Sequence, residues 1–365
     1  MLDKINGLAL YCLKNLGKGL PKLIIEDRKM KYRSISMKAV SEITGVSIAT
    51  VSRVINNNGR FSKDTRERVL SAINENGYIP NALAQGLRKS RMQNIGIIVP
   101  DITNEFFAKM ALYIQQTLFE MNYSTLIYNT DENIVLETRH LQNLVAQNVS
   151  AIVFIAGGGN PQFDVNKFSV PMIFLDRTPP RTREIVDYIS IHTDNFEGGY
   201  LAGKEMVKGN CRKPAVVMDE RKMSNQLDRL NGFKKALSET NIQIKPEAIF
   251  KVPRVNCEAA YKVTCDFINK GKSYDSYFCT TDLLAIGTMT ALIENNVSIP
   301  KQVRIIGYDD VSIANYCSVP LTTIHQDIKG MSDLAVKLLL DILNGINPDK
   351  QEFIFDPVLV KRQSA

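Results

Sequence analysis

The spacing of apolar residues changes near residue 94 of this chain. Before that point, apolar residues recur every three to four positions, which is the period of a helix with one buried face. Three short helices are predicted, at 37–44, 46–55 and 63–76. A serine stands at or near the start of each run, where its side chain can cap the first backbone N–H groups: Ser36, Ser47 and Ser62.

Beyond residue 94, short apolar runs alternate with longer amphipathic stretches. The apolar runs predict buried strands at 95–99, 125–128, 151–155, 172–175, 215–218, 277–279 and 303–306. The amphipathic stretches predict helices that include 106–121, 134–147, 199–208 and 224–238. This alternation is typical of parallel sheets covered on both faces, and the number of units favours two similar α/β lobes with a ligand cleft between them.

The segment 40–56 fits a helix-turn-helix. One apolar seam is expected to consist of Val40, Ile43, Val46, Val51 and Val54. Gly45 permits the sharp turn between the two helices. Polar residues then project from the second helix, and the free N–H groups of its first turn can approach phosphates at a major groove. A generic amphipathic helix pair is the alternative for this segment taken alone.

The charge of the chain supports the DNA-binding interpretation. The formal net charge is +7, and residues 1–93 carry 17 Lys and Arg residues against seven Asp and Glu residues. Residues 94–365 carry 28 basic residues against 31 acidic ones. A local positive surplus is what neutralisation of DNA phosphates requires, although an acidic membrane surface would attract it as well.

Other candidate chemistry is sparse. The six cysteines show no CxxC spacing, so we expect reduced thiols in a cytoplasmic protein and neither a zinc site nor a disulfide framework. Three dispersed histidines and a Gly157–Gly159 run without a phosphate-loop continuation favour no enzymatic activity, no metal and no cofactor. The apolar run at 8–13 is too short to span a membrane, so no membrane association is expected.

Several motifs resemble the lactose-repressor (LacI/GalR) family of bacterial transcriptional regulators. They occur in the family's order: GVSIATVSRVIN at 45–56, YIPNALAQGL at 78–87, NEFF at 104–107, LDR at 175–177, DN at 194–195, IGYDD at 306–310 and LTTIHQ at 321–326. The similarity runs from about Ser36 to Gln363. It implies a small all-α helix-turn-helix domain plus hinge helix, followed by two α/β parallel-sheet lobes of periplasmic-binding-protein-like architecture.

The resemblance and the patterns together predict the domain boundaries. Residues 1–35 are an appendage, and one hypothesis is that translation begins at Met30. The other expected segments are the helix-turn-helix domain at 36–80, the hinge helix and linker at 81–93, and the effector-binding and dimerisation domain at 94–365. Its first lobe is expected at 94–192 and 325–347, and its second at 193–324 and 348–365.

The resemblance also implies which residues contact DNA. Ile48 and Ala49 match the family's specificity positions, where small apolar side chains can touch thymine methyls, and Arg53 matches an arginine that reads guanine. The residues that match phosphate contacts are Ser47, Thr50, Ser52 and Asn56.

The hinge segment 81–87 matches a helix that enters the minor groove, where Leu87 would wedge between bases. Asn81, Ala84 and Arg88 complete this set. A helix this short is expected to be ordered chiefly when docked on DNA, and Gly86 weakens it by about 1 kcal/mol relative to alanine.

The effector cleft is implied in the same way. Its expected residues are Asp101, Thr103, Phe106, Phe107, Asp176, Arg177, Asp194, Arg229, Thr281, Asp282 and Asp309. Arginine and carboxylates beside aromatic faces suit a polyhydroxylated or heterocyclic ligand. Val255 stands where the family commonly has an aromatic residue, which favours a sugar-like effector over a purine.

The expected function is that of a repressor of a carbohydrate-utilisation operon. It would bind double-stranded, pseudo-palindromic operator DNA as a homodimer, with a tetramer as the alternative. A small molecule in the cleft would change the angle between the lobes and reposition the hinge, so that effector and DNA affect each other's affinity. The rival is a ligand-binding protein of the periplasmic type, which would have an export signal and no helix-turn-helix.

Overall fold

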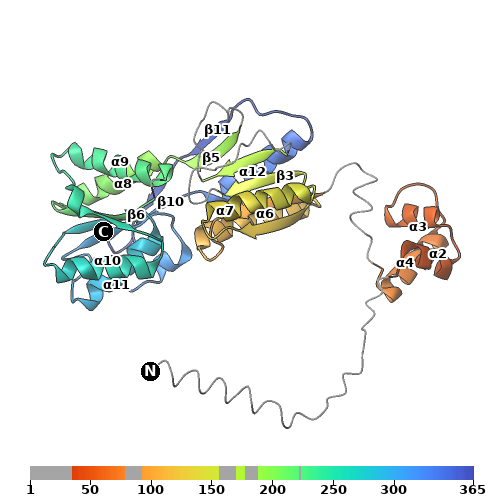
Figure 1. Cartoon of the computed structure of the whole chain (residues 1–365), viewed down its shortest axis with the longest axis horizontal. Helices are drawn as coiled ribbons and strands as arrows, with labels where there is room; N and C mark the ends of the chain where they lie inside the picture. The colour runs from red at the N-terminus through yellow and green to blue at the C-terminus, as the bar shows by residue number, and fades with distance from the viewer. Residues whose placement is uncertain (1–34, 79–92, 156–169, 177–187, 222) are drawn as a thin grey trace, which may run out of the picture. The chain divides into compact units, whose positions relative to one another are not determined.

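The structure, a computed structural model, describes residues 35–78, 93–155, 170–176, 188–221 and 223–365. The chain divides into two compact units, Met1–Gln85 and Gly86–Ala365 (Figure 1). Most of the expected appendage and all of the expected hinge helix lie outside the described residues. The predicted site residues that lie outside them are Asn81, Ala84, Leu87, Arg88 and Arg177.

The first unit holds three helices, α2 (Met37–Thr44), α3 (Ile48–Ile55) and α4 (Lys63–Asn76). The side chains of the three serines accept hydrogen bonds from the N–H groups of Ala39, Thr50 and Thr65, which confirms the predicted caps. The second helix starts two residues later than predicted because Ser47 is extended as its cap. Gly45 ends α2 in the left-handed region at φ 69°, as the predicted turn requires.

The core of this unit differs from the predicted seam at one position. Val40, Val51 and Val54 are buried as predicted, and Val46 packs against them, whereas Ile43 is 56% exposed. Thr44 takes the buried place, because it lies one turn after Val40 on the same helix face. Its hydroxyl is satisfied by donating to the carbonyl of Val40 at 2.7 Å.

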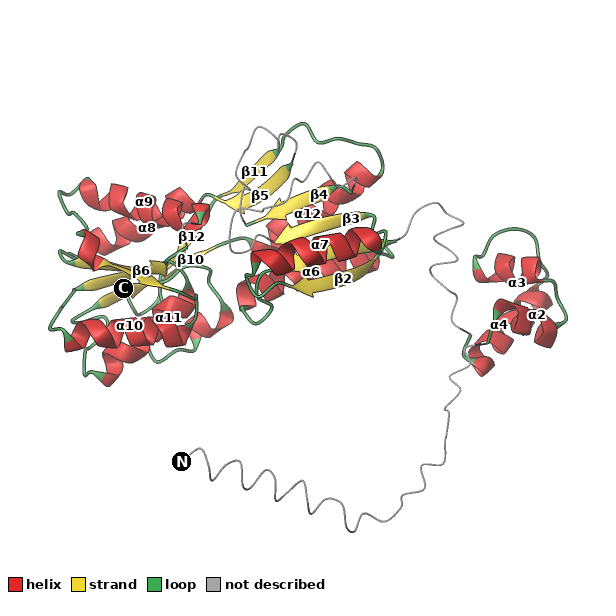
Figure 2. Ribbon diagram, in the orientation of Figure 1, coloured by secondary structure: helices red, strands yellow, loops and turns green. Residues whose placement is uncertain are grey.

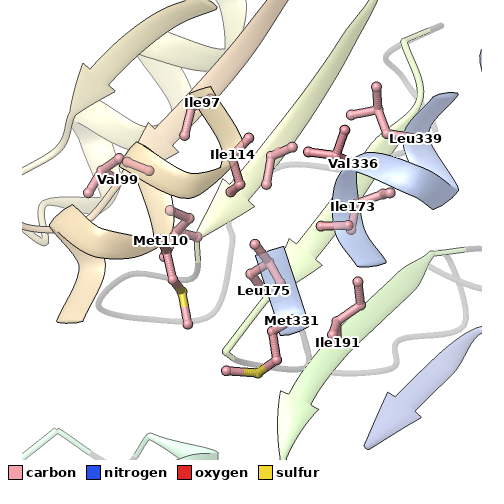
Figure 3. Close-up of a cluster of buried hydrophobic side chains, with 14 of the residues drawn as sticks. Ile97, Val99, Met110, Ile114, Ile173, Leu175, Ile191, Met331, Val336 and Leu339 are labelled. Carbon is pink, nitrogen blue, oxygen red and sulfur yellow. The ribbon is translucent and has the colours of Figure 1, made fainter. Parts of the chain in front are cut away.

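The first lobe of the second unit is a six-stranded parallel sheet with the strand order β11-β5-β4-β3-β1-β2. Its strands are β1 (Asn94–Val99), β2 (Ser124–Asn129), β3 (Ala151–Ile155), β4 (Met172–Leu175), β5 (Ile189–Thr193) and β11 (Glu352–Phe355). Its helices are α6 (Glu105–Glu120), α7 (Ile134–Ala146) and α12 (Ile328–Leu343). Figure 3 shows part of the core that α6 and α12 form with the sheet, including Met110, Ile173 and Met331.

The second lobe contains a four-stranded parallel sheet with the order β7-β6-β8-β9. Its strands are β6 (Pro214–Asp219), β7 (Ile249–Val252), β8 (Ser276–Cys279) and β9 (Arg304–Ile306). Its α-helices are α8 (Asn195–Lys208), α9 (Ser224–Ser238), α10 (Cys257–Asn269) and α11 (Asp282–Glu294), and its 3-10 helices are η2 (Pro246–Ala248) and η3 (Ser312–Asn315). These observations confirm the predicted fold class.

The chain passes between the lobes three times (Figure 2). The crossings lie between β5 and α8, between β10 (Thr323–His325) and α12, and between β11 and β12 (Val358–Val360). Strands β10 and β12 pair antiparallel beside the second lobe. Strand β11 corrects the expected boundary: residues 348–365 were assigned wholly to the second lobe, but β11 pairs with β5 of the first, where Phe353 and Phe355 reach its core.

Candidate DNA-binding helix and effector site

The predicted base-reading residues lie on α3, away from the core of the first unit. Ile48 is 44% exposed, and Ala49 and Arg53 are exposed as well. The stem of Arg53 runs beside Gly59, because a Cβ added to that glycine would stand 3.2 Å from the arginine Cδ. Gly59 has a φ of 96°, which L side chains rarely adopt. The loop after α3 therefore leaves room for the arginine side chain.

The residues predicted to hold phosphates also have structural roles. Ser47 accepts from the N–H of Thr50 at 3.2 Å, and the hydroxyls of the two residues are 2.9 Å apart. Asn56 donates from its Nδ2 to the carbonyl of Ser52 at 2.7 Å. Ser47 and Thr50 lie at the start of α3, where free N–H groups favour a phosphate, whereas Asn56 is the C-cap of the helix.

Most of the predicted effector residues line a pocket between the two lobes. Its cavity volume is about 50 Å³, and the pocket is partly open to solvent. The predicted residues that line it are Asp101, Phe106, Phe107, Asp176, Arg229, Thr281 and Asp309. Val255 lines it as well. The lining residues follow parallel strands or begin helices, as ligand sites in open α/β sheets do.

Three other predicted residues are placed elsewhere. Thr103 is exposed and donates from its Oγ1 to Asp101 at 2.6 Å, so it orients a lining residue. Asp194 caps α8 by accepting from the N–H of Glu197 at 2.9 Å. Asp282 is fully buried and accepts from the backbone N–H of Val311, which ties the start of α11 to a neighbouring loop. Burial raises the pKa of Asp282 well above its usual value.

The prediction missed seven lining residues: Asn104, Glu132, Asp219, Arg221, Met223, Asn225 and Gln226. Five of them lie between the last residue of β6 and the first turn of α9. Since the carboxyl ends of parallel strands carry the ligand site in such folds, the polar stretch after the strand predicted at 215–218 was a usable signal.

Arg229 is the charged centre of the pocket wall and is only 2% exposed. Its Nε donates to Asn195 at 2.7 Å, and its Nη1 donates to the carbonyl of Thr280 at 2.7 Å. The guanidinium lies 3.7 Å from the ring centroid of Tyr308, a cation–π contact. Its Nη1 is also 3.5 Å from a carboxylate oxygen of Asp309. These contacts fix the plane of the guanidinium before any ligand binds.

Asp309 lies opposite this arginine and is also buried. Burial raises the pKa of Asp309 to about 7, although the positive charge of Arg229 limits the rise. Gln326 donates from its Nε2 to the Asp309 carboxylate at 2.8 Å. The backbone of Asp309 has a φ of 110°, so the turn after β9 is held in a conformation that non-glycine residues rarely adopt.

Close packing of α8 on α9 sets the position of the arginine. A Cβ on Gly199 would lie 1.9 Å from the carbonyl oxygen of Arg229, and a Cβ on Gly232 would lie 1.8 Å from that of Phe196. Only glycine allows the two helix backbones to approach this closely. The helix pair therefore holds Arg229 and its partner Asn195 in one rigid piece of the second lobe.

Polar contacts bridge the lobes around the pocket. Glu132 of the first lobe accepts from Arg221 of the second at 2.7 Å. Asn225 donates to Asp176 across the pocket at 3.2 Å. Further bridges join Asp131 to Arg254, and Glu105 to both the N–H and the hydroxyl of Ser312. The lobes thus meet through hydrogen bonds and ion pairs beside the ligand pocket.

Within the described ranges, no group of three or more His, Cys, Asp or Glu side chains is arranged to hold a metal ion. The cysteines among these residues are free thiols. None of the helices formed by the described residues has the length and apolar character needed to cross a membrane.

A helix-turn-helix unit joined to a two-lobed unit with a pocket between the lobes defines a DNA-binding transcriptional regulator with an effector-binding domain. Residues 36–81 match the bacterial regulatory proteins of the lacI family, and residues 204–365 match the periplasmic binding protein-like domain. The chain belongs to the LacI family.

The relatives cover nearly the same length. The chain is 30% identical over 332 residues to the HTH-type transcriptional repressor PurR of Pasteurella multocida, spanning 90% of this chain and 98% of the relative. It is 28% identical over 333 residues to the regulator RegA of Clostridium saccharobutylicum, with 90% and 98% covered. Among solved structures, the lac repressor bound to ONPG is 25% identical at a TM-score of 0.80, with 91% of this chain and all of that chain covered.

Proposed function

We propose that the protein represses a carbohydrate-utilisation operon by binding a pseudo-palindromic operator as a homodimer under the control of a sugar-like effector. The observation that carries this proposal is the pocket between the lobes, with a buried, pre-oriented arginine in its wall. An effector there contacts both lobes, so it favours one angle between them over another. A ligand can shift a conformational equilibrium only through such a difference in affinity.

The proposed DNA contacts rest on α3. Ile48 and Ala49 offer apolar surface for thymine methyl groups, and Arg53 offers the paired donors that guanine accepts. The phosphate contacts would come from Ser47, Thr50, Ser52 and Asn56, and the minor-groove contacts from Asn81, Ala84, Leu87 and Arg88. In this proposal the lobes act on DNA through the segment 81–87, whose pairing with a second copy changes when the lobes move.

A homodimer is supported by exposed apolar side chains on both lobes. On the first lobe these are Leu112, Phe119, Met121 and Ile127. On the second lobe they include Ile293, Ile313 and Tyr316. Phe119 and Tyr316 are 72% and 81% exposed in the single chain, and a second copy that covered them would remove this apolar surface from water. A solved relative is a lac repressor dimer bound to operator.

The sugar-like effector is supported by the lining of the pocket. Phe106 and Phe107 meet edge to face at a centroid distance of 5.3 Å and supply apolar surface beside the carboxylates. Val255 offers no aromatic face on which a purine would stack. A 28% identical regulator from Enterococcus faecium was solved with bound ribose, at a TM-score of 0.65, with 74% of this chain and 98% of that chain covered.

Operator selection from random duplex DNA tests the proposal. The full chain is expected to enrich a two-fold symmetric sequence, and Arg53→Ala is expected to lose the enrichment while retaining weak binding to bulk DNA. A thermal-shift screen of sugars then identifies the effector, with Arg229→Ala as the variant that should not respond. Absence of sequence preference at physiological salt would contradict the regulator, and stabilisation only by purines would contradict the sugar-like effector.

A further inference from the structure

The described residues that line the pocket carry more acidic than basic groups. The carboxylates are Asp101, Glu132, Asp176, Asp219 and Asp309, and the cations are Arg221 and Arg229. A pocket that received a phosphate or a carboxylate would be expected to present an arginine whose charge is not already balanced by carboxylates. Among the described lining residues, these two arginines are the groups that would bind a negatively charged ligand.

Two carboxylates already balance the charge of Arg221. Its Nη2 and Nε bind Asp219 in a forked pair at 2.5 and 2.9 Å, and its Nη1 binds Glu132 of the other lobe at 2.7 Å. Burial disfavours the charged form, but these hydrogen bonds outweigh it and raise the pKa of Arg221. An anionic ligand beside Arg221 would meet two carboxylates that already balance its charge, whereas a neutral ligand leaves this group intact.

Arg229 is engaged by protein groups as well. Its Nε and Nη1 bind Asn195 and the Thr280 carbonyl, and Asp309, whose pKa is about 7, balances its charge in part. Three of the five lining acids contact the two arginines. Glu132 and Asp219 contact Arg221, and Asp309 contacts Arg229. Asp101 and Asp176 add further negative charge to the lining.

Gln226 offers a hydrogen-bond acceptor to a ligand in the pocket. Its side chain lines the pocket, is only 6% exposed, and its Oε1 has no hydrogen-bond partner. A buried oxygen without a donor is costly, so a bound molecule that supplies an N–H or O–H would be favoured there. Hydroxyl and ammonium groups meet this need, while a fully ionised phosphate or carboxylate offers only acceptors.

We propose that the pocket selects an uncharged or cationic polyhydroxylated effector, such as a neutral or amino sugar, and rejects phosphate esters and sugar acids. This inference rests on the proposed function only in taking the pocket as the effector site. The described feature that opposes it is the start of α9, which has no side-chain cap and whose N–H groups would attract an anion. Met223 stands at that position. The reactivity of a thiol placed there therefore reports whether the lining carboxylates or the N–H groups of the helix start dominate the local potential.

The test measures the charge preference of the pocket without any effector. The thiol introduced by Met223→Cys in the full chain is modified with a cationic and an anionic methanethiosulfonate of similar size, and the rates are read by mass spectrometry on the tryptic peptide 223–229. That peptide contains no native cysteine. The reference is Ser238→Cys, an exposed position at the other end of α9 whose tryptic peptide 236–251 also lacks cysteine.

The cationic reagent is expected to react about tenfold faster, relative to the reference, since one net negative charge about 8 Å away has this effect at an effective dielectric constant of about 60. Asp101→Asn should reduce the preference. An equal or faster reaction of the anionic reagent would overturn the proposal, whatever the protein does on DNA. In a thermal-shift comparison of matched sugars, amino sugars and phosphate esters, a phosphate ester that stabilises the protein more than its parent sugar would overturn it too.

Discussion

The buried carboxyl of Asp309 makes a prediction about stability that needs no ligand. Its pKa is about 7 in the folded chain, against an ordinary value of 3.8 for an aspartate. Between these values the folded state holds a proton that the unfolded state has released. The group therefore adds stability that is fully present below about pH 4 and is lost as the pH rises through about 7.

The variant Asp309→Asn removes this dependence, because an amide resembles the protonated carboxyl and does not titrate. The difference in unfolding free energy between the wild type and the variant should fall by about 2 to 3 kcal/mol from about pH 5 to about pH 8. The absolute difference also contains the lost attraction to Arg229, so only its change with pH is diagnostic. Titrating groups remote from Asp309 are common to both proteins and cancel, whereas the pKa of Asp282, which the charge of Asp309 raises, is lower in the variant.

Urea unfolding followed by far-ultraviolet circular dichroism measures the effect, since the chain has no tryptophan for fluorescence. The exposed substitution Asp349→Asn serves as the control, because an exposed carboxylate keeps its hydration on folding. If the difference between wild type and Asp309→Asn stays constant within about 0.5 kcal/mol over this range, the carboxyl does not hold its proton as argued.

Three further predictions concern other parts of the chain. Arg53→Ala should weaken operator binding by about 1 to 3 kcal/mol in a fluorescence anisotropy titration, with a smaller loss on unrelated DNA. Gly232→Ala should lower the free energy of unfolding by at least about 2 kcal/mol, because the new methyl meets the Phe196 carbonyl; an unchanged Tm would refute the close helix contact. Ser62→Ala should cost the first unit about 1 kcal/mol through loss of the α4 cap, and the mid-helix change Ser71→Ala should cost less.

The helix-turn-helix unit could be predicted almost completely from its sequence. Each of its helices begins at a capping serine, and glycines end α2 and α4, so the signals lie next to the structure that they determine. The error at Ile43 arose because a hydrophobic residue beside the seam was preferred to a threonine within it. A threonine can replace an apolar residue inside a helix pair when its hydroxyl bonds to the preceding turn, as Thr44 does.

In the two-lobed unit some strands were predicted accurately and others were missed. Long apolar strands such as β1 and β3 were found within a residue of their bounds, whereas β5 and β7 were missed because Ser190, His192 and Lys251 interrupt them. The short strands β11 and β12 were missed although most of their residues are apolar. The sequence also indicated most of the pocket, but it placed Asp282 in the lining. Both Thr281 and Asp282 stand at the start of α11, and only packing decides that the threonine faces the pocket while the carboxyl turns inward toward Val311.

The three crossings between the lobes have a practical consequence for dissecting the protein. The first lobe is assembled from two stretches of chain, because α12 and β11 return to it after the whole second sheet has been formed. Truncation after Asp194 would strip α12 from one face of the first sheet and β11 from its edge, leaving apolar surface bare. A single cut at any one crossing would leave the lobes covalently joined. The helix-turn-helix, by contrast, is one uninterrupted stretch that can be exchanged as a cassette, while the lobes can be exchanged only as a pair.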